Sequence, residues 1–143
     1  MVVDPSDRFS EFHWPDLGIT VGVRMWFDVN PSIAEKVWNA LPFKSLTGHA
    51  VVAGDGIWVA TRIVYFGPKR MVKRARGDVY FFPTGQSISL TYGSTITESA
   101  KVNKFGQVVD DDLEALGRVG RYVWDTTVAS AKPRPVLVEV RRR

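Results

Sequence analysis

The sequence of 143 residues contains no cysteine and only two histidines. The absence of cysteine excludes disulfide bonds, thiolate metal ligands and a cysteine nucleophile. A three-ligand zinc site usually needs more imidazole or thiolate groups than this chain offers, so we expect no metal site. No motif in the chain calls for a cofactor, and we expect none.

Long apolar runs are also missing. None reaches the ~18 residues that a membrane-spanning helix needs. Residues 1–11 contain Asp4, Asp7 and Glu11 and lack the apolar block of a secretory signal. We therefore expect a single-domain, cytoplasmic protein of bacterial type that has no membrane partner.

Glycine-rich phosphate-binding motifs and the Gly-x-Ser-x-Gly nucleophile motif are absent as well. The net charge is +4, and much of the basic excess lies in the segment Lys69–Arg76. That segment has none of the aromatic residues that nucleic-acid-binding modules interleave with basic ones. We interpret it as a solvated loop, which argues against a nucleic-acid partner. Binding of a phosphate-rich ligand by this loop is the alternative.

The residues that are present favour β-structure around one good helix. Apolar and polar residues alternate from Ile19 to Phe27, as in a half-buried strand. Asn30 and Pro31 then read as the cap and first residue of a helix that ends before Pro42. Further strands are expected at His49–Val52, Ile57–Val64, Asp78–Phe82, Ser87–Tyr92, Lys101–Val109 and Pro135–Val140.

These elements predict the domain organisation. Short strands at this spacing indicate a mostly-β fold, a small closed barrel, over residues 19–143. The acidic run Asp110–Asp112 favours the start of a second, short helix. Residues 1–18, which include Pro5 and Pro15, are expected to form an irregular N-terminal arm whose aromatic side chains dock on the barrel.

Two segments carry a resemblance to a known family. Gly77–Gly93 has a Gly-Asp pair, apolar residues, Pro-x-Gly, an apolar strand and an aromatic-Gly pair, and Val102–Val109 contains Val-Asn-x-x-Gly-x-Val. Together with Leu41-Pro42-Phe43 and Gly48-His49-Ala50, they resemble small bacterial cyclophilin-like proteins of largely unknown function. More remotely, the chain is similar to opine synthases of the cucumopine and mikimopine type, which cyclise a histidine–keto-acid imine. The resemblance implies a closed cyclophilin-like barrel of eight strands with a pocket on one side.

The same resemblance argues against prolyl isomerase activity. True cyclophilins carry a Phe-Gly-Lys-Val strand after a catalytic-site histidine, and Phe105–Val108 is similar to that strand. Val102 and Thr97 stand where cyclophilins place histidine and tryptophan. The resemblance therefore implies the cyclophilin-like fold but not prolyl isomerase activity.

Candidate site residues follow from their chemistry. His49 stands at a predicted strand entry, where its imidazole can exchange a proton near neutral pH, and its family counterpart resembles a pocket residue. Glu98 is a carboxylate in the loop after Tyr92. We predict His49 and Glu98 as catalytic groups. The predicted ligand-binding residues are the aromatic Trp58, Phe82 and Tyr92, the amide Gln86, and the carboxylate-binding arginines Arg24 and Arg62.

Two functions fit these residues. The first is binding of a small carboxylate-bearing or nitrogen-heterocyclic molecule in a side pocket, with acid–base chemistry such as a lyase, cyclisation or isomerisation step. The alternative is a non-catalytic interaction or self-assembly module, a homo-oligomer, because five tryptophans and eight phenylalanines are many for one small core. The sequence leaves open whether the protein is an enzyme.

Overall fold

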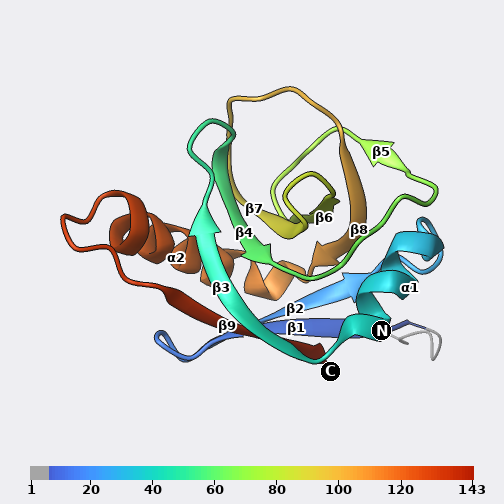
Figure 1. Cartoon of the computed structure of the whole chain (residues 1–143), viewed down its shortest axis with the longest axis horizontal. Helices are drawn as coiled ribbons and strands as arrows, with labels where there is room; N and C mark the ends of the chain where they lie inside the picture. Colours follow the sequence, from blue (N-terminus) through green and yellow to red (C-terminus); the bar gives the residue numbers. More distant parts are fainter. Residues whose placement is uncertain (1–6) are drawn as a thin grey trace.

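The structure is a computed structural model that describes residues 7–143. Its elements are mostly β-strands, interrupted by two α-helices, as Figure 1 shows. The elements are β1 (Phe9–Trp14), β2 (Ile19–Met25), α1 (Pro31–Ala40), β3 (Phe43–His49), β4 (Gly54–Ala60), β5 (Met71–Val72), β6 (Asp78–Phe82), β7 (Ser87–Ile96), β8 (Val102–Val108), α2 (Leu113–Val123) and β9 (Val136–Arg142). A 3-10 turn (Asp110–Asp112) precedes α2, and a π-helical turn (Trp124–Val128) follows it.

The strands form a closed barrel. Their order is β2-β1-β9-β3-β4-β7-β6-β8, and β8 pairs back to β2, so eight antiparallel strands complete the ring. The two-residue β5 adds to β8 beside β2. Closure removes the free strand edges that would otherwise pair with other chains. The predicted closed, eight-stranded barrel with one or two helices is confirmed.

The strand β1 differs from expectation. Its residues were predicted to lie in an irregular arm, but they pair with β2 on one side and β9 on the other. Ser10, Phe12 and Trp14 are buried, whereas Glu11 and His13 between them are partly exposed. This alternation is the signal of a strand, and the nearby prolines obscured it. The barrel therefore begins ten residues before the predicted boundary at residue 19.

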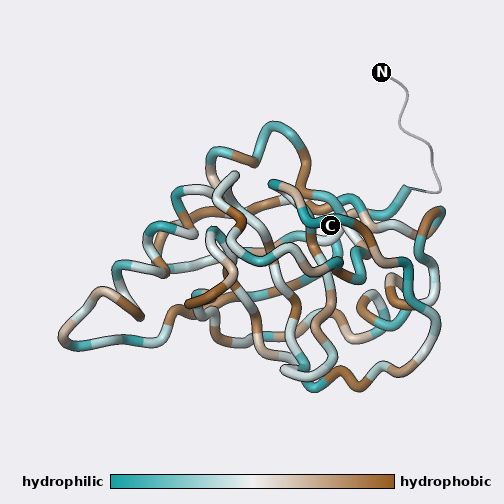
Figure 2. Tube along the Cα trace, turned by 90° about the horizontal axis from the view of Figure 1, so that it is seen from above, coloured by the Kyte–Doolittle hydropathy of each residue, from teal (hydrophilic) through white to brown (hydrophobic). Residues whose placement is uncertain are grey.

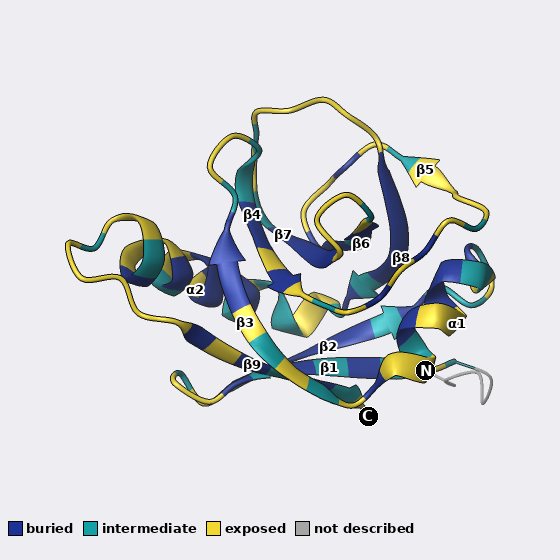
Figure 3. Cartoon of the chain, viewed as in Figure 1, coloured by how far each residue is buried: buried dark blue, intermediate teal, exposed yellow. Residues whose placement is uncertain are grey.

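The barrel interior is filled by alternate residues of each strand. On the wall made of β4, β7 and β6, Leu90 pairs with Ile57 on one side and Val79 on the other, and all three are buried. The inward residues of β2 are Val21, Val23 and Met25, as the sequence predicts. Figure 2 shows hydrophobic and hydrophilic residues following one another along the chain trace, and Figure 3 shows buried and exposed residues alternating along β4 and β9.

The two helices lie at opposite sides of the barrel in Figure 1. The helix α2 contacts β2, β3, β4 and β7, which lie on different sides of the ring, so it must cross one open end of the barrel. The helix α1 buries Ile33, Ala34 and Val37. The predicted cap Asn30 makes no side-chain cap; its amide donates instead to Asn103 Oδ1 and to the Lys104 carbonyl, both at 2.8 Å, and so ties the start of α1 to β8.

A cluster around Glu11 joins the first and last strands, and it gives a pH-dependent prediction. Glu11 accepts hydrogen bonds from Arg141 Nε at 2.9 Å and from Arg143 Nε at 3.1 Å. The bond from Arg141 is the main cause that lowers the pKa of Glu11 below its usual value, against an opposing effect of burial. A lowered pKa stabilises the fold above pH ~4.5, and this contribution is lost as the pH falls through the folded-state pKa.

We therefore expect Glu11→Gln to lower the free energy of unfolding at pH 7 and to differ less from wild type at pH 3. Urea denaturation at both pH values measures the free energy of unfolding of the two proteins. Glu139→Gln is the control: Glu139 lies 3.8 Å from Arg141, but Glu11 and both its arginines remain. The prediction is contradicted if the difference in unfolding free energy between wild type and Glu11→Gln is the same at pH 7 and pH 3.

No helix among residues 7–143 is both long and apolar enough to cross a membrane.

Candidate functional site

A cavity of about 520 Å³ opens at the end of the barrel that α2 covers. It is framed by the end of β3, the start of β4, β7, and the junction of α2 with the π-helical turn. The structure places His49 at the end of β3, whereas the sequence analysis expected it at the entry of a strand. The residues that line the cavity are His49, Ala50, Val51, Gly54, Asp55, Tyr92, Thr97, Arg121, Trp124 and Asp125.

His49 and Tyr92 form a hydrogen-bonded pair at this cavity. His49 is 7% exposed, and its Nδ1 lies 2.6 Å from the Ala50 carbonyl oxygen. A carbonyl oxygen only accepts, so Nδ1 carries the proton and the other ring nitrogen is left with a lone pair. That nitrogen, Nε2, lies 2.6 Å from the Tyr92 hydroxyl. The Tyr92 hydroxyl therefore donates to a histidine whose tautomer is fixed by the backbone.

Aromatic rings hold the His49 imidazole from two sides. The ring centroid of Tyr92 lies 5.4 Å away and that of Trp124 lies 4.9 Å away, both in edge-to-face geometry. Trp124 is the first residue of the π-helical turn and is 38% exposed, so one part of its indole remains open to a ligand. Single π-helical turns occur frequently at functional sites, where they redirect side chains of a helix.

Gly120 sets the position of Tyr92. A Cβ atom at Gly120 would lie 2.3 Å from Cδ1 of Tyr92, far inside contact distance. The tyrosine ring therefore packs directly on the backbone of α2. Glycine weakens a helix, as the sequence suggests for this segment, but here its missing side chain is what admits the ring.

Charged side chains surround the Tyr92 hydroxyl. Burial is the main cause that raises the pKa of Tyr92, the negative charges of Asp55 and Asp125 raise it further, and the positive charge of Arg121 opposes them. The hydroxyl therefore keeps its proton well beyond neutral pH and acts as a donor. Asp55 is held in place because its Oδ2 accepts a hydrogen bond from the Thr95 backbone N–H at 3.1 Å.

The structure brings together only part of the predicted site. His49 and Tyr92 are paired, although they are 43 residues apart. Glu98 is exposed in the loop after β7 and does not line the His49 cavity. Arg24 lies on β2, where its Nη1 is 3.3 Å from Asp28 Oδ1. Trp58 and Phe82 are 40% and 51% exposed, respectively, and neither lines the His49 cavity.

Arg62 and Gln86 lie near each other but away from His49. Gln86 is the last residue of the β6–β7 turn, with φ 48°, and its Nε2 donates to the Ile63 carbonyl at 3.3 Å. Its own carbonyl accepts from the Thr61 backbone N–H at 2.9 Å. Arg62 lines a different cavity, between α1, β3 and the segment after β4. The sequence analysis combined into one pocket residues that the fold keeps apart: His49 and Tyr92 line one cavity, Arg62 lines another, and the other predicted residues line neither.

Sequence analysis missed Asp55, Arg121 and Trp124. Asp55 sits between two glycines, which is typical of a turn and hid its place in β4. Arg121, near the end of α2, and Trp124, the first residue of the π-helical turn, are three residues apart, a spacing that puts both on one face of a helix. That spacing was the available signal, but it indicates nothing until the helix is known to lie over His49.

The basic segment Lys69–Arg76 is not simply a solvated loop. Arg74 is 8% exposed, and its guanidinium donates to the Ala53 carbonyl and, at 3.3 Å, to the Tyr80 hydroxyl. A buried arginine with protein partners is not available to a phosphate-rich ligand. Among residues 7–143, no group of three or more His, Cys, Asp or Glu side chains is placed to hold a metal ion.

The chain belongs to the cyclophilin-like family, whose model matches residues 17–134. Among solved structures, it is similar to McbB in complex with tryptophan, with 30% identity and a TM-score of 0.82. The similarity covers 94% of this chain but 44% of the McbB chain, so this chain spans less than half the length of McbB. The hypothetical protein AF2241 from Archaeoglobus fulgidus shares the fold, with 19% identity, a TM-score of 0.65 and complete coverage of both chains. No curated protein matches the chain.

Proposed function

We propose that this protein binds a small molecule of the tryptophan type in the cavity beside His49, and that Tyr92 and His49 form its proton-transfer pair. The observation that carries the proposal is the combination of a cation, two carboxylates and an indole around a partly buried His–Tyr hydrogen bond. The tryptophan bound by McbB, a structural relative, supports the same class of ligand.

The charges of the cavity match an amino acid zwitterion. Arg121 offers a planar guanidinium to the ligand carboxylate. Asp55 and Asp125 offer carboxylates to its ammonium group, and Trp124 together with Ala50 and Val51 offers an apolar wall to its ring. Among the described residues, Arg121, Asp55 and Asp125 form no salt bridge with one another or with other side chains, so their charges are free for a ligand.

The His–Tyr pair can relay a proton. When the Tyr92 oxygen takes a proton from the ligand, its own proton passes to His49 Nε2 over the 2.6 Å hydrogen bond. The imidazolium that forms keeps its Nδ1–H bond to the Ala50 carbonyl. The reverse sequence returns the proton to the ligand, so the pair serves as both acid and base.

Calorimetric titration with L-tryptophan tests the binding site. Loss of a hydrogen bond to a charged group removes about 1.5–3 kcal/mol, so Arg121→Gln should weaken binding roughly tenfold or more. Arg118→Gln is the matched control, because Arg118 is an exposed arginine on the same helix and does not line this cavity. Tryptamine, which lacks the carboxylate, should bind to wild type and to Arg121→Gln with equal affinity.

Equal weakening by the two arginine variants, or wild-type affinity in Arg121→Gln, would contradict the binding proposal. Tyr92→Phe tests the proton pair separately, because phenylalanine keeps the ring on Gly120 and removes the hydroxyl. It should retain binding within a few-fold and abolish exchange of a ligand C–H proton with D2O, followed by proton NMR. Exchange at the wild-type rate in Tyr92→Phe would exclude the pair as the proton-transfer group.

A further inference from the structure

A second cavity, of about 950 Å³, lies where β3 and β4 separate. The two strands pair only from Thr47 to His49 with Ile57 to Val59. The first half of β3 continues along β9, while the chain after Ala60 leaves the sheet, although residues 61–64 were predicted to continue the strand. The cavity between them is bounded by the C-terminal half of α1. We call it the Arg62 groove.

The charged residues that line the Arg62 groove are all basic. Its lining includes the cations Lys36, Lys44 and Arg62 and no acidic residue. Within residues 7–143, none of these three cations forms a salt bridge. Unpaired positive charges around one concavity raise the local concentration of anions.

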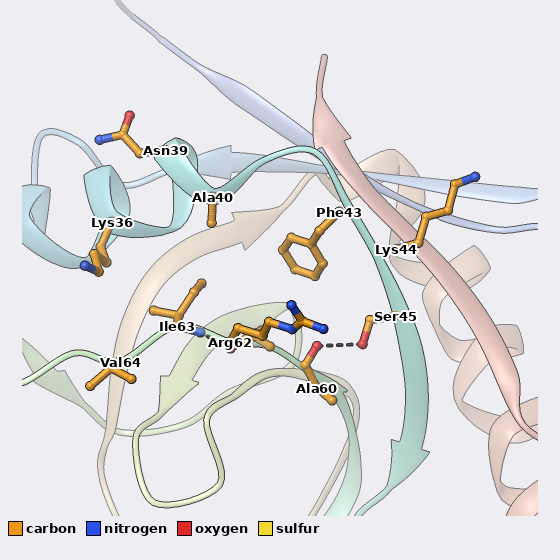
Figure 4. Close-up of a pocket in the computed structure, with 11 residues that line it drawn as sticks. Lys36, Asn39, Ala40, Phe43, Lys44, Ser45, Ala60, Arg62, Ile63 and Val64 are labelled. Atoms are coloured by element: carbon orange, nitrogen blue, oxygen red, sulfur yellow. Dashed lines mark hydrogen bonds between the residues drawn. The ribbon is translucent and has the colours of Figure 1, made fainter.

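The floor of the groove is apolar, and the arginine lies over it. Figure 4 shows the Arg62 side chain across the middle of the groove, with the Phe43 ring beside it and Ile63 and Ala40 on the side towards α1. Ser45 and Ala60 close one side, where Ser45 Oγ donates to the Ala60 carbonyl at 2.6 Å. Lys36 lies at the α1 rim, whereas the Lys44 ammonium points away from the groove, on the other side of β3 from Phe43 and Ser45. A ligand would therefore meet an aromatic face and a guanidinium at the centre and a second cation, Lys36, at one edge.

The end of α1 does not cancel this positive charge. Helix C-termini carry a partial negative charge on their free carbonyl groups. Here the Trp38 carbonyl accepts hydrogen bonds from Arg142 Nη2 at 3.0 Å and Nε at 3.3 Å, which compensates that end of the helix. Asn39 and Ala40, the residues of α1 that follow, line the groove.

We propose that the Arg62 groove is a second ligand site, separate from the His49 cavity, and that it binds a small aromatic phosphate monoester. A phosphate monoester carries about −1.5 to −2 charges near pH 7, so it suits a groove with more than one cation better than a single carboxylate does. Arginine binds phosphate oxygens with its planar fork, and Lys36 at the rim adds a point charge. The Phe43 ring supplies the contact for the aromatic part of the ligand.

Calorimetry with phenyl phosphate, inorganic phosphate and benzoate tests the proposal. Phenyl phosphate should bind at least tenfold more tightly than either of the others, since only it has both the double charge and the ring. Arg62→Gln should weaken the binding of phenyl phosphate at least tenfold and leave the binding of L-tryptophan unchanged. Arg121→Gln should leave the binding of phenyl phosphate unchanged. Near-UV circular dichroism verifies that each variant keeps the wild-type fold.

Arg118→Gln removes the same charge outside the groove and should leave the affinity for phenyl phosphate unchanged. The proposal is overturned if phenyl phosphate shows no saturable binding at millimolar concentration, or if Arg62→Gln binds it as wild type does. It is also overturned if Arg118→Gln loses as much affinity, since net charge alone would then be responsible. None of these results depends on whether tryptophan binds beside His49.

Discussion

Replacing Lys104 by methionine is expected to lower the free energy of unfolding by about 3 kcal/mol or more, because it leaves a buried carboxylate without its cation. Lys104 Nζ lies 2.7 Å from Asp78 Oδ1, and the two side chains are only 10% and 4% exposed. Methionine keeps the unbranched shape and most of the length of the side chain and removes its charge. Most domains are stable by about 5–15 kcal/mol, so the loss is a large share of the total.

Other groups support the same ion pair. The ammonium of Lys104 also donates to Gln107 Oε1 at 2.6 Å and lies 4.2 Å from the ring centroid of Trp26. Asp78 Oδ2 accepts the Ala75 backbone N–H at 2.8 Å, which fixes the turn before β6. Removing the lysine therefore also leaves the Gln107 oxygen without this donor and removes a cation–π contact.

Arg24→Met is the matched control, measured by urea denaturation in parallel. Arg24 Nη1 lies 3.3 Å from Asp28 Oδ1, but the Asp28 side chain is 65% exposed. An exposed pair contributes about 0–1 kcal/mol, so this variant should change stability little. The double variant Asp78→Asn with Lys104→Met should be more stable than Lys104→Met alone, because no charge is then stranded. Equal effects of Lys104→Met and Arg24→Met would show that burial of the pair is not what makes it strong.

Two residues of the family motifs, Asp78 and Asn103, belong to this structural framework rather than to the cavity beside His49. Asp78 of the Gly-Asp pair joins β6 to β8 through Lys104. Asn103 of the Val-Asn pair accepts the Arg70 backbone N–H at 3.0 Å and the Asn30 amide at 2.8 Å. Fixed backbone connections require particular residues at particular spacings, which is why such motifs indicate the fold and say little about the ligand.

The fold was predictable where local patterns decide it. Alternation along β2, β6 and β7 and the helical spacing of α1 follow from which side chains must face the interior. The strand β1 was missed because its alternation lies between prolines, and the end of β4 was misplaced by four residues, 61–64. In β4 the sequence still favours a strand, but the chain turns away from its neighbour, and this separation creates the Arg62 groove.

The candidate site was only partly predictable because it is assembled by contacts between distant segments. His49 was identified from its chemistry, and Tyr92 from its motif. Their hydrogen bond depends on the position of β3 relative to β7, which lie on either side of β4. Arg121 and Trp124 join them only because α2 crosses the barrel end. No local sequence pattern indicates which end of the barrel a helix will cover.

Replacing Gly120 by alanine is expected to abolish tryptophan binding and to destabilise the fold, although alanine is the better helix former. The new methyl group would lie 2.3–2.5 Å from three atoms of the Tyr92 ring, so the ring must move away from α2. Such overpacking typically costs about 1–3 kcal/mol, which outweighs the roughly 0.5–1 kcal/mol that alanine gains over glycine inside a helix. Movement of the ring also breaks the Tyr92–His49 hydrogen bond.

Gly117→Ala separates these two effects, because it makes the same substitution one turn earlier on α2. A Cβ atom at Gly117 would meet Arg121 Nη1 at 3.6 Å and the Tyr92 carbonyl oxygen at 3.9 Å, which are ordinary contacts. This variant should therefore be more stable than wild type by about 0.5–1 kcal/mol and should bind tryptophan normally. Thermal unfolding and calorimetric titration measure both properties. If both glycine variants gain stability and bind tryptophan alike, the packing of Tyr92 on Gly120 does not position the proton-transfer pair. If Gly120→Ala loses stability and Gly117→Ala gains it, the missing side chain at Gly120 is what positions the pair.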